Sequence, residues 1–190
     1  MIPGQNTAAV PRLRPPFYKR MKSIHLKDAA ATEKLAEIIA SCLEGRLVLG
    51  LVGNLGAGKT CLSRGIAKQL GVQEEVCSPT FLMLNEYQSG RIPFFHFDLY
   101  RLQEDLDMQS QASLNLKAEF DEIMESSSKL LVAIEWINLW EEFCSQYDEL
   151  RLEFRLCTDG AGREVEMQAR GKVAERVLAC CQEKIAKSPL

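Results

Sequence analysis

Apolar side chains recur at helical spacing in the first regularly patterned part of the chain. From Thr32 onward they stand at i, i+3, i+4, i+7 and i+8, and these positions are Leu35, Ile38, Ile39, Cys42 and Leu43. The spacing predicts an amphipathic helix over residues 32–44, with Thr32 as its N-cap and Gly45 at its end. Residues 47–52 then form a continuous apolar run that includes Gly50. A central parallel strand, covered on both faces, has this pattern.

Helical and strand-like patterns alternate along the rest of the chain. After a glycine-rich turn, residues 58–70 have apolar side chains at helical spacing and end at Gly71. The later patterns predict, in order, a hairpin of strands 81–87 and 92–98, a mostly helical acidic segment 103–128, a buried strand 129–134, a short helix near 138–146, a second hairpin of strands 149–157 and 163–170, and a helix from about 172 to 187. The predicted fold class is α/β.

The N-terminal segment differs from the remainder in charge. Residues 1–27 contain six basic residues, no acidic residue and four of the seven prolines. We therefore expect a flexible basic tail over residues 1–27 and a single domain over residues 28–190. The remainder has 17 basic and 26 acidic side chains. Such an acidic surface argues against a large contact with a phosphate backbone, so any nucleic acid is expected to be reached through a partner.

Neither the apolar runs nor the cysteines indicate a membrane or secreted protein. The longest apolar run has six residues, whereas a membrane-spanning helix needs roughly 20. The N-terminal segment lacks the apolar stretch of a secretory signal. Seven cysteines form an odd count without a CxxC pair or Cys/His ligand spacing. We expect reduced thiols, no zinc site and a cytoplasmic location.

Residues 53–60 carry the strongest chemical signal. Their sequence, Gly-Asn-Leu-Gly-Ala-Gly-Lys-Thr, fits G-x4-G-K-[ST] between a predicted strand and a predicted helix. In such a loop, backbone N–H groups and the positive end of the helix dipole surround an anion. Lys59 would add a positive charge, and Thr60 would offer its hydroxyl to Mg²⁺. The chain has no Asn-Lys-x-Asp motif for reading guanine, which favours ATP over GTP.

Two carboxylates follow apolar strands. Asp98 and Glu135 stand where strands 92–98 and 129–134 end, and open α/β sheets bind ligands at the carboxyl ends of their strands. A P-loop ATPase needs a carboxylate that holds Mg²⁺ or its water, and a group that places the attacking water. We assign Thr60 and Glu135 to the metal, and Asp98 to the metal shell or the attacking water. A pair of strand-end caps is the alternative.

Several strings after the loop form a recognisable combination. They are Ser78-Pro79-Thr80-Phe81, His96-Phe97-Asp98-Leu99-Tyr100-Arg101 and Ile134-Glu135-Trp136. With the loop, they resemble the TsaE family of P-loop ATPases in tRNA threonylcarbamoyladenosine (t6A) biosynthesis, over roughly residues 30–172. The resemblance implies a P-loop NTPase fold, with a mostly parallel central sheet, helices on both faces and antiparallel hairpin additions. It also implies ATP or ADP and Mg²⁺ as ligands, TsaB and TsaD as protein partners, and tRNA contacted indirectly through them.

The resemblance, with the position of Thr80 in a switch-like segment, implies a set of nucleotide-contacting residues. They are Thr32, Gly53, Asn54, Leu55, Gly56, Ala57, Gly58, Lys59, Thr60, Cys61, Thr80, Asp98, Trp136 and Arg163. Within this set, Lys59 and Asp98, together with Glu135, are the candidate catalytic residues. Thr32 has a helix cap as its alternative role, Thr80 a turn before the strand, Trp136 a place in the core and Arg163 a solvated hairpin charge. His96 is interpreted as a buried, hydrogen-bonded histidine without a catalytic role.

The expected function is ATP hydrolysis in support of a TsaB–TsaD heterodimer that transfers a threonylcarbamoyl group to adenosine of tRNA. Turnover is expected to be slow without these partners. A small-molecule kinase is one alternative, but residues 103–128 contain no arginine for a lid over the phosphates. A nucleotide-dependent scaffold with negligible turnover is the other.

Overall fold

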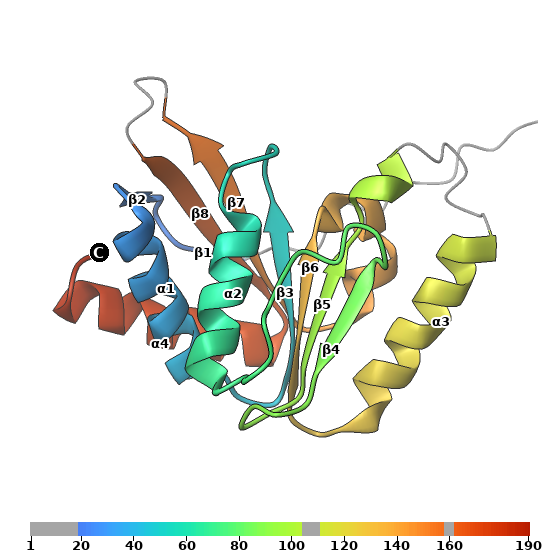
Figure 1. Ribbon diagram of the computed structural model, residues 1–190. Coiled ribbons are helices and arrows are strands. Elements are labelled where there is room, and N and C mark those ends of the chain that lie inside the picture. Colours follow the sequence, from blue (N-terminus) through green and yellow to red (C-terminus); the bar gives the residue numbers. More distant parts are fainter. Residues whose placement is uncertain (1–18, 104–110, 158–161) are drawn as a thin grey trace, which may run out of the picture.

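One mixed sheet forms the centre of the molecule, with helices on either side (Figure 1). The computed structural model describes residues 19–103, 111–157 and 162–190. Its strands are β1 (Lys19–Arg20), β2 (Ile24–Leu26), β3 (Arg46–Val52), β4 (Leu84–Tyr87), β5 (Phe94–Asp98), β6 (Leu130–Glu135), β7 (Glu149–Leu156) and β8 (Arg163–Arg170). Its α-helices are α1 (Ala29–Cys42), α2 (Lys59–Leu70), α3 (Gln111–Ser126) and α4 (Lys172–Lys187), and its 3-10 helices are η1 (Tyr100–Gln103), η2 (Ile137–Trp140) and η3 (Phe143–Gln146).

The sheet is parallel at its centre and antiparallel at both edges. Its order is β1-β8-β7-β3-β6-β5-β4, with β2 also paired to β8. Strands β7, β3, β6 and β5 run parallel to one another. At one edge β4 pairs antiparallel with β5, and at the other β8 pairs antiparallel with β7, β1 and β2. The predicted α/β class and both predicted hairpins are confirmed. In this register Asp98 lies opposite Glu135, so the two predicted site carboxylates are cross-strand neighbours.

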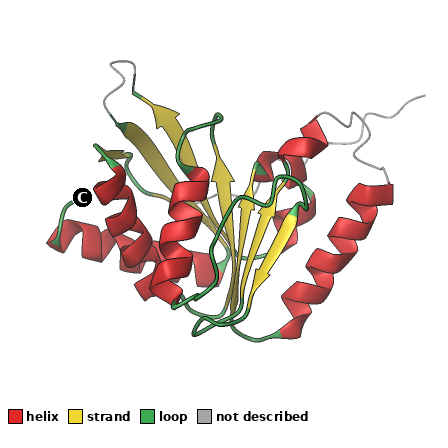
Figure 2. Cartoon of the chain, viewed as in Figure 1, coloured by secondary structure: helices red, strands yellow, loops and turns green. Residues whose placement is uncertain are grey.

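Helices cover both faces of the sheet (Figure 2). Leu47, Leu49 and Leu51 of β3 belong to the apolar cluster that contains α1, α2 and α4. Val48 belongs to the cluster on the opposite face, where α3 and the 3-10 helices pack. Because successive side chains of a strand point to opposite faces, both faces of β3 are buried. This burial explains why the run lacks polar alternation.

Helix α1 begins three residues before its predicted start. Asp28 is its N-cap, because its extended backbone lies outside the helix and its carboxylate accepts from the N–H of Ala31 at 2.8 Å. The prediction that Thr32 caps this helix is therefore wrong, as is the prediction that the helix ends at Gly45. Leu43 is the C-cap. At the end of α2, Gly71 adopts the left-handed conformation of a C-cap, as predicted.

Part of the predicted N-terminal tail belongs to the sheet. Residues 19–20 and 24–26 form β1 and β2, which pair with β8, so the tail boundary at residue 27 is placed too late. Strands of two or three residues are too short to show a period of two. Residues 1–18 lie outside the described residues.

Other boundaries also shift by a few residues. Strand β4 starts at residue 84 rather than 81, since Met83 has a φ of 63° and Phe81 and Leu82 are exposed. The short helix expected near residues 138–146 is two 3-10 turns. Residues 104–110 of the predicted acidic helical segment and residues 158–161 of the second turn lie outside the described residues. Within the described ranges, no helix is long and apolar enough to span a bilayer.

A disulfide joins Cys42, at the end of α1, to Cys180 in α4. The expectation of reduced thiols is therefore wrong for this pair. The two Cα atoms are 5.8 Å apart and the residues are 138 positions apart in sequence, so only the packing of α1 against α4 reveals the pair. The neighbouring Cys181 is a buried free thiol, and burial raises its pKa to about 12.

Replacing both bonded cysteines, as Cys42→Ala/Cys180→Ala, should lower the free energy of unfolding by about 2–4 kcal/mol, because the cross-link restricts the unfolded chain. Denaturant unfolding without reductant measures the loss. Cys77→Ala, which removes an exposed free cysteine, is the control and should behave as the wild type. Equal stability of the oxidised wild type and the double variant would contradict a stabilising cross-link.

Candidate functional site

The glycine-rich loop lies between the end of β3 and the start of α2. Gly58 is the N-cap of α2 and has a φ of 110°, a left-handed conformation that favours glycine. A Cβ atom on Gly58 would also lie 2.5 Å from Nη1 of Arg163. A Cβ atom on Gly53 would lie 2.9 Å from the carbonyl oxygen of Phe154. The loop thus needs glycine both for its turn and for its contact with the β7–β8 hairpin.

Lys59 folds its side chain back over this loop. Its Nζ donates to the carbonyl oxygens of Gly53 at 2.8 Å and Asn54 at 3.1 Å, and it lies 4.0 Å from the centroid of the Trp136 ring. The residue is only 4% exposed. Burial lowers the pKa of Lys59, while the carboxylates of Glu135 and Asp98 oppose this shift. The loop therefore presents a buried cation at the start of a helix.

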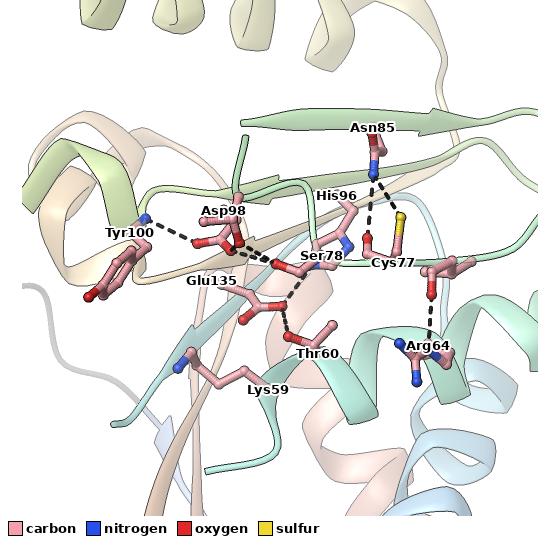
Figure 3. A network of polar contacts seen from close by, with 12 residues as sticks. Lys59, Thr60, Arg64, Cys77, Ser78, Asn85, His96, Asp98, Tyr100 and Glu135 are labelled. Atoms are coloured by element: carbon pink, nitrogen blue, oxygen red, sulfur yellow. Dashed lines mark hydrogen bonds and ion pairs between the residues drawn. The ribbon is translucent and has the colours of Figure 1, made fainter. Parts of the chain in front are cut away.

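Glu135 connects α2 to the central strands (Figure 3). Thr60 donates its hydroxyl to Oε1 of Glu135 at 2.7 Å, and Nε2 of His96 lies 3.0 Å from the same oxygen. Glu135 is 3% exposed and His96 is fully buried. Three residues from α2, β6 and β5 thus meet at one carboxylate oxygen.

Asp98 holds the segment that follows residue 77. Its Oδ2 accepts from the hydroxyls of Ser78 at 2.6 Å and Thr80 at 2.7 Å. Its Oδ1 accepts from the N–H of Tyr100 at 3.0 Å. These contacts place the Thr80 hydroxyl beside Asp98 (Figure 3 shows the Ser78 and Asp98 side chains).

These side chains have the composition of a magnesium site. Thr60, Glu135 and Asp98 offer hydroxyl and carboxylate oxygens, which Mg²⁺ prefers. Hydrogen bonds within the set already orient the Thr60 hydroxyl toward Glu135. The residues present therefore fit the metal that the loop motif implies.

These groups line an open cavity of about 420 Å³, within the size range of small-ligand sites. Ten of the predicted site residues line it, and they are Leu55, Gly56, Gly58, Lys59, Thr60, Cys61, Thr80, Asp98, Glu135 and Trp136. Gly53, Asn54 and Ala57 belong to the same loop without lining the cavity. The cavity thus brings together the loop and the carboxyl ends of β5 and β6, which are far apart in the sequence.

Arg163 and Thr32 stand apart from the cavity lining. Arg163 places its guanidinium against Gly58, so it reaches the loop from β8. Thr32 is fully buried inside α1, and its hydroxyl donates to the carbonyl oxygen of Asp28 at 3.2 Å. The structure thus brings Arg163 to the loop and places Thr32 in the helix interior.

Trp136 lies at the cavity rather than in the core. It is half-buried, and its φ of 62° is left-handed, an unusual backbone conformation that concentrates at functional sites. Its backbone N–H donates to the carbonyl oxygen of Leu51 at 2.9 Å, and its indole ring packs against Tyr100. The core tryptophan is Trp140, which is 1% exposed.

Two lining residues, Ser78 and Tyr100, were not predicted as site residues. Both lie in the strings quoted above, but a serine before a proline and a tyrosine after a strand have no specific chemical signature. His96 was predicted as a buried, hydrogen-bonded histidine, and its position agrees. Its partner, Glu135, was not predictable because it is 39 residues away.

Comparisons with known proteins agree on one family. Residues 26–165 match the family model described as threonylcarbamoyl adenosine biosynthesis protein TsaE. The TsaE protein of Nostoc sp. (strain PCC 7120) is 42% identical over 117 residues, 62% of this chain and 68% of that protein. Bacillus subtilis TsaE is 34% identical over 152 residues, 80% of this chain and 86% of that protein. The crystal structure of Bacillus subtilis YdiB superposes with a TM-score of 0.65 at 25% identity and covers 88% of this chain and 97% of its own.

Proposed function

The chain belongs to the TsaE family of P-loop nucleotide-binding proteins, and on that premise we propose that it hydrolyses ATP to support t6A synthesis on tRNA. The observation that carries this proposal is the placement of Lys59, Thr60, Glu135 and Asp98 around one cavity. A cation and a hydroxyl at the start of a helix, with two carboxylates at the ends of neighbouring strands, are the groups that phosphoryl transfer needs.

The loop and Lys59 bind the phosphates. Residues at the start of α2 line the cavity, and at this end of a helix the free N–H groups and the helix dipole favour an anion. Lys59 exchanges the carbonyl oxygens of Gly53 and Asn54, its present acceptors, for phosphate oxygens. Charge-assisted hydrogen bonds of this kind contribute roughly 1.5–3 kcal/mol each.

The two carboxylates have different roles, one toward the metal and one toward the attacking water. Glu135 and Thr60 would hold Mg²⁺, which supplies charge neutralisation between the phosphates. Asp98 accepts hydrogen bonds from Ser78 and Thr80, so its orientation is fixed toward the cavity, where it positions the attacking water. Thr80 donates its hydroxyl to Asp98 and would thereby link the terminal phosphate to the segment that follows it.

That segment supports a role within a complex. Phe81 and Leu82, directly after Thr80, are 80% and 75% exposed, and Leu55 of the phosphate loop is 78% exposed. Large apolar side chains exposed next to residues that line a site favour contact with another protein. We propose that TsaB and TsaD cover this surface, and that tRNA is reached through them.

Glu135→Gln should reduce the rate constant of ATP hydrolysis by roughly 10²-fold, a loss typical of removing one electrostatic contact in the transition state. The variant keeps the hydrogen-bond acceptor for Thr60 but loses the charge, so ADP affinity should change much less than turnover. Single-turnover hydrolysis and calorimetric titration with ADP measure the two effects. Glu86→Gln, at an exposed position of β4, is the control. Equal losses of affinity and turnover in Glu135→Gln would mean that this residue is only structural.

The proposed function itself is tested by reconstituting t6A formation from TsaB, TsaD and tRNA, with the other substrates supplied. Adding the chain should sustain repeated turnover, and the three proteins together should hydrolyse ATP faster than this chain alone. The Glu135→Gln variant should fail to sustain repeated t6A formation. If Glu135→Gln supports t6A formation as well as the wild type does, the chain acts as a nucleotide-dependent scaffold and the hydrolytic role is wrong.

A further inference from the structure

Three potential metal ligands gather outside the nucleotide cavity, where β2, β7 and β8 meet. His25 lies in β2 opposite Glu164 of β8, and Cys157 directly follows β7. Nδ1 of His25 is 3.2 Å from Oε1 of Glu164 and 3.7 Å from Sγ of Cys157. The three ligand atoms all lie within 4.8 Å of one another. An imidazole, a thiol and a carboxylate therefore converge from three segments.

The spacing of these atoms fits a tetrahedral metal ion. With Zn–N and Zn–O bonds near 2.1 Å and a Zn–S bond near 2.3 Å, ligand atoms of a tetrahedral site are about 3.4 to 3.6 Å apart. The two separations measured from His25 Nδ1, 3.2 and 3.7 Å, differ from these values by only a few tenths of an ångström. Two of the three separations are thus close to tetrahedral values, and the third, between the ligand atoms of Cys157 and Glu164, is at most 4.8 Å.

The backbone that carries the ligands is held by the sheet. Residues 24–26 of β2 pair with residues 163–165 of β8, and the N–H of Cys157 donates to the carbonyl oxygen of Gly162 at 3.3 Å. A Cβ atom on Gly162 would lie 2.6 Å from the carbonyl oxygen of Leu26, so glycine allows β2 to approach the hairpin. The cluster is thus built on regular strands and a hairpin end.

A further hydrogen bond orients the carboxylate. Ser23 donates its hydroxyl to Oε2 of Glu164 at 2.6 Å, which leaves Oε1 turned toward His25. Metal-binding carboxylates are commonly oriented by such outer contacts. The side chains of His25 and Glu164 are 50% and 44% exposed, which leaves a path for an ion.

We propose that His25, Cys157 and Glu164 form a zinc-binding site, with water as a fourth ligand. A thiolate with an imidazole favours zinc over Mg²⁺ or Ca²⁺, which take oxygen ligands. The thiolate and the carboxylate balance the two charges of the ion, and the thiol proton of Cys157 leaves to solvent on binding. The site lies beside Arg163, whose guanidinium contacts Gly58, so bound zinc ties β2 to the strand that supports the phosphate loop.

The test is zinc binding by the full-length, tag-free chain, stripped of metal and held without oxygen or reductant so that the Cys42–Cys180 disulfide stays closed. Competition with a chromophoric chelator is measured without nucleotide and with excess Mg²⁺, so the oxygen ligands of the nucleotide site are occupied. The wild type should bind one equivalent of zinc. Because the binding is measured without ATP, failure here leaves the proposed hydrolytic function standing.

Cys157→Ser and His25→Ala should each weaken zinc binding by at least about tenfold, since even the loss of an outer partner costs about 10–100-fold. Cys77→Ser, which changes an exposed free cysteine outside the cluster, should bind as the wild type does. With Co²⁺ as a probe, thiolate-to-metal charge-transfer absorption should appear in the wild type and in Cys77→Ser but not in Cys157→Ser.

Melting temperatures measured without zinc identify any variant that fails to fold. Glu164→Gln serves as a further variant, because it removes the carboxylate charge without changing the size of the side chain. Zinc should raise the melting temperature of the wild type and of Cys77→Ser, and should raise that of Glu164→Gln less. Absence of zinc binding by the wild type, or an equal loss in Cys77→Ser and Cys157→Ser, would overturn the proposal.

Discussion

The buried ammonium group of Lys59 is the charge on which the site depends. Its position follows from the end of β3 and the glycine-rich turn, which lead directly into α2. Two carbonyl oxygens and the Trp136 ring surround Nζ, while the carboxylates of Glu135 and Asp98 stabilise its charge from the neighbouring strands. A buried cation held mainly by backbone carbonyls is prepared to exchange them for an anion with more negative charge. The parallel register of β3, β6 and β5 sets this arrangement.

The parts of the structure that were predictable are those with a local sequence signal. The unbroken apolar runs before Gly53 and Glu135 identified the two central strands, and the loop motif identified the residues at their ends. Asp98 and Glu135 each stand at the end of a strand-like run, which was enough to place both at the carboxyl ends of neighbouring strands. The start of α1 was not predictable to the residue. Asp28 and Thr32 both have side chains that can cap a helix, and the local sequence does not show which of them does.

The features that the sequence did not reveal join residues far apart in the chain. The Cys42–Cys180 disulfide and the contact of His96 with Glu135 exist only because helices and strands pack side by side. Likewise, β1 and β2 are too short to show a pattern and are defined by their pairing with β8. The cluster of His25, Cys157 and Glu164 follows from that pairing, so it has no ligand spacing in the sequence. Pairing between segments far apart in the sequence thus joins β2 to β8, the strand in which Arg163 lies.

The most direct test of this account is the affinity of Lys59→Ala for Mg²⁺-ADP and Mg²⁺-ATP, measured by calorimetry against the wild type. Removing the buried cation should weaken binding of both nucleotides by at least about tenfold, which corresponds to the loss of one charge-assisted contact. The variant should remain folded, because the carbonyl oxygens that Lys59 contacts lie in an open loop beside the cavity. Unchanged affinity in a folded Lys59→Ala protein would contradict the claim that this loop binds the phosphates.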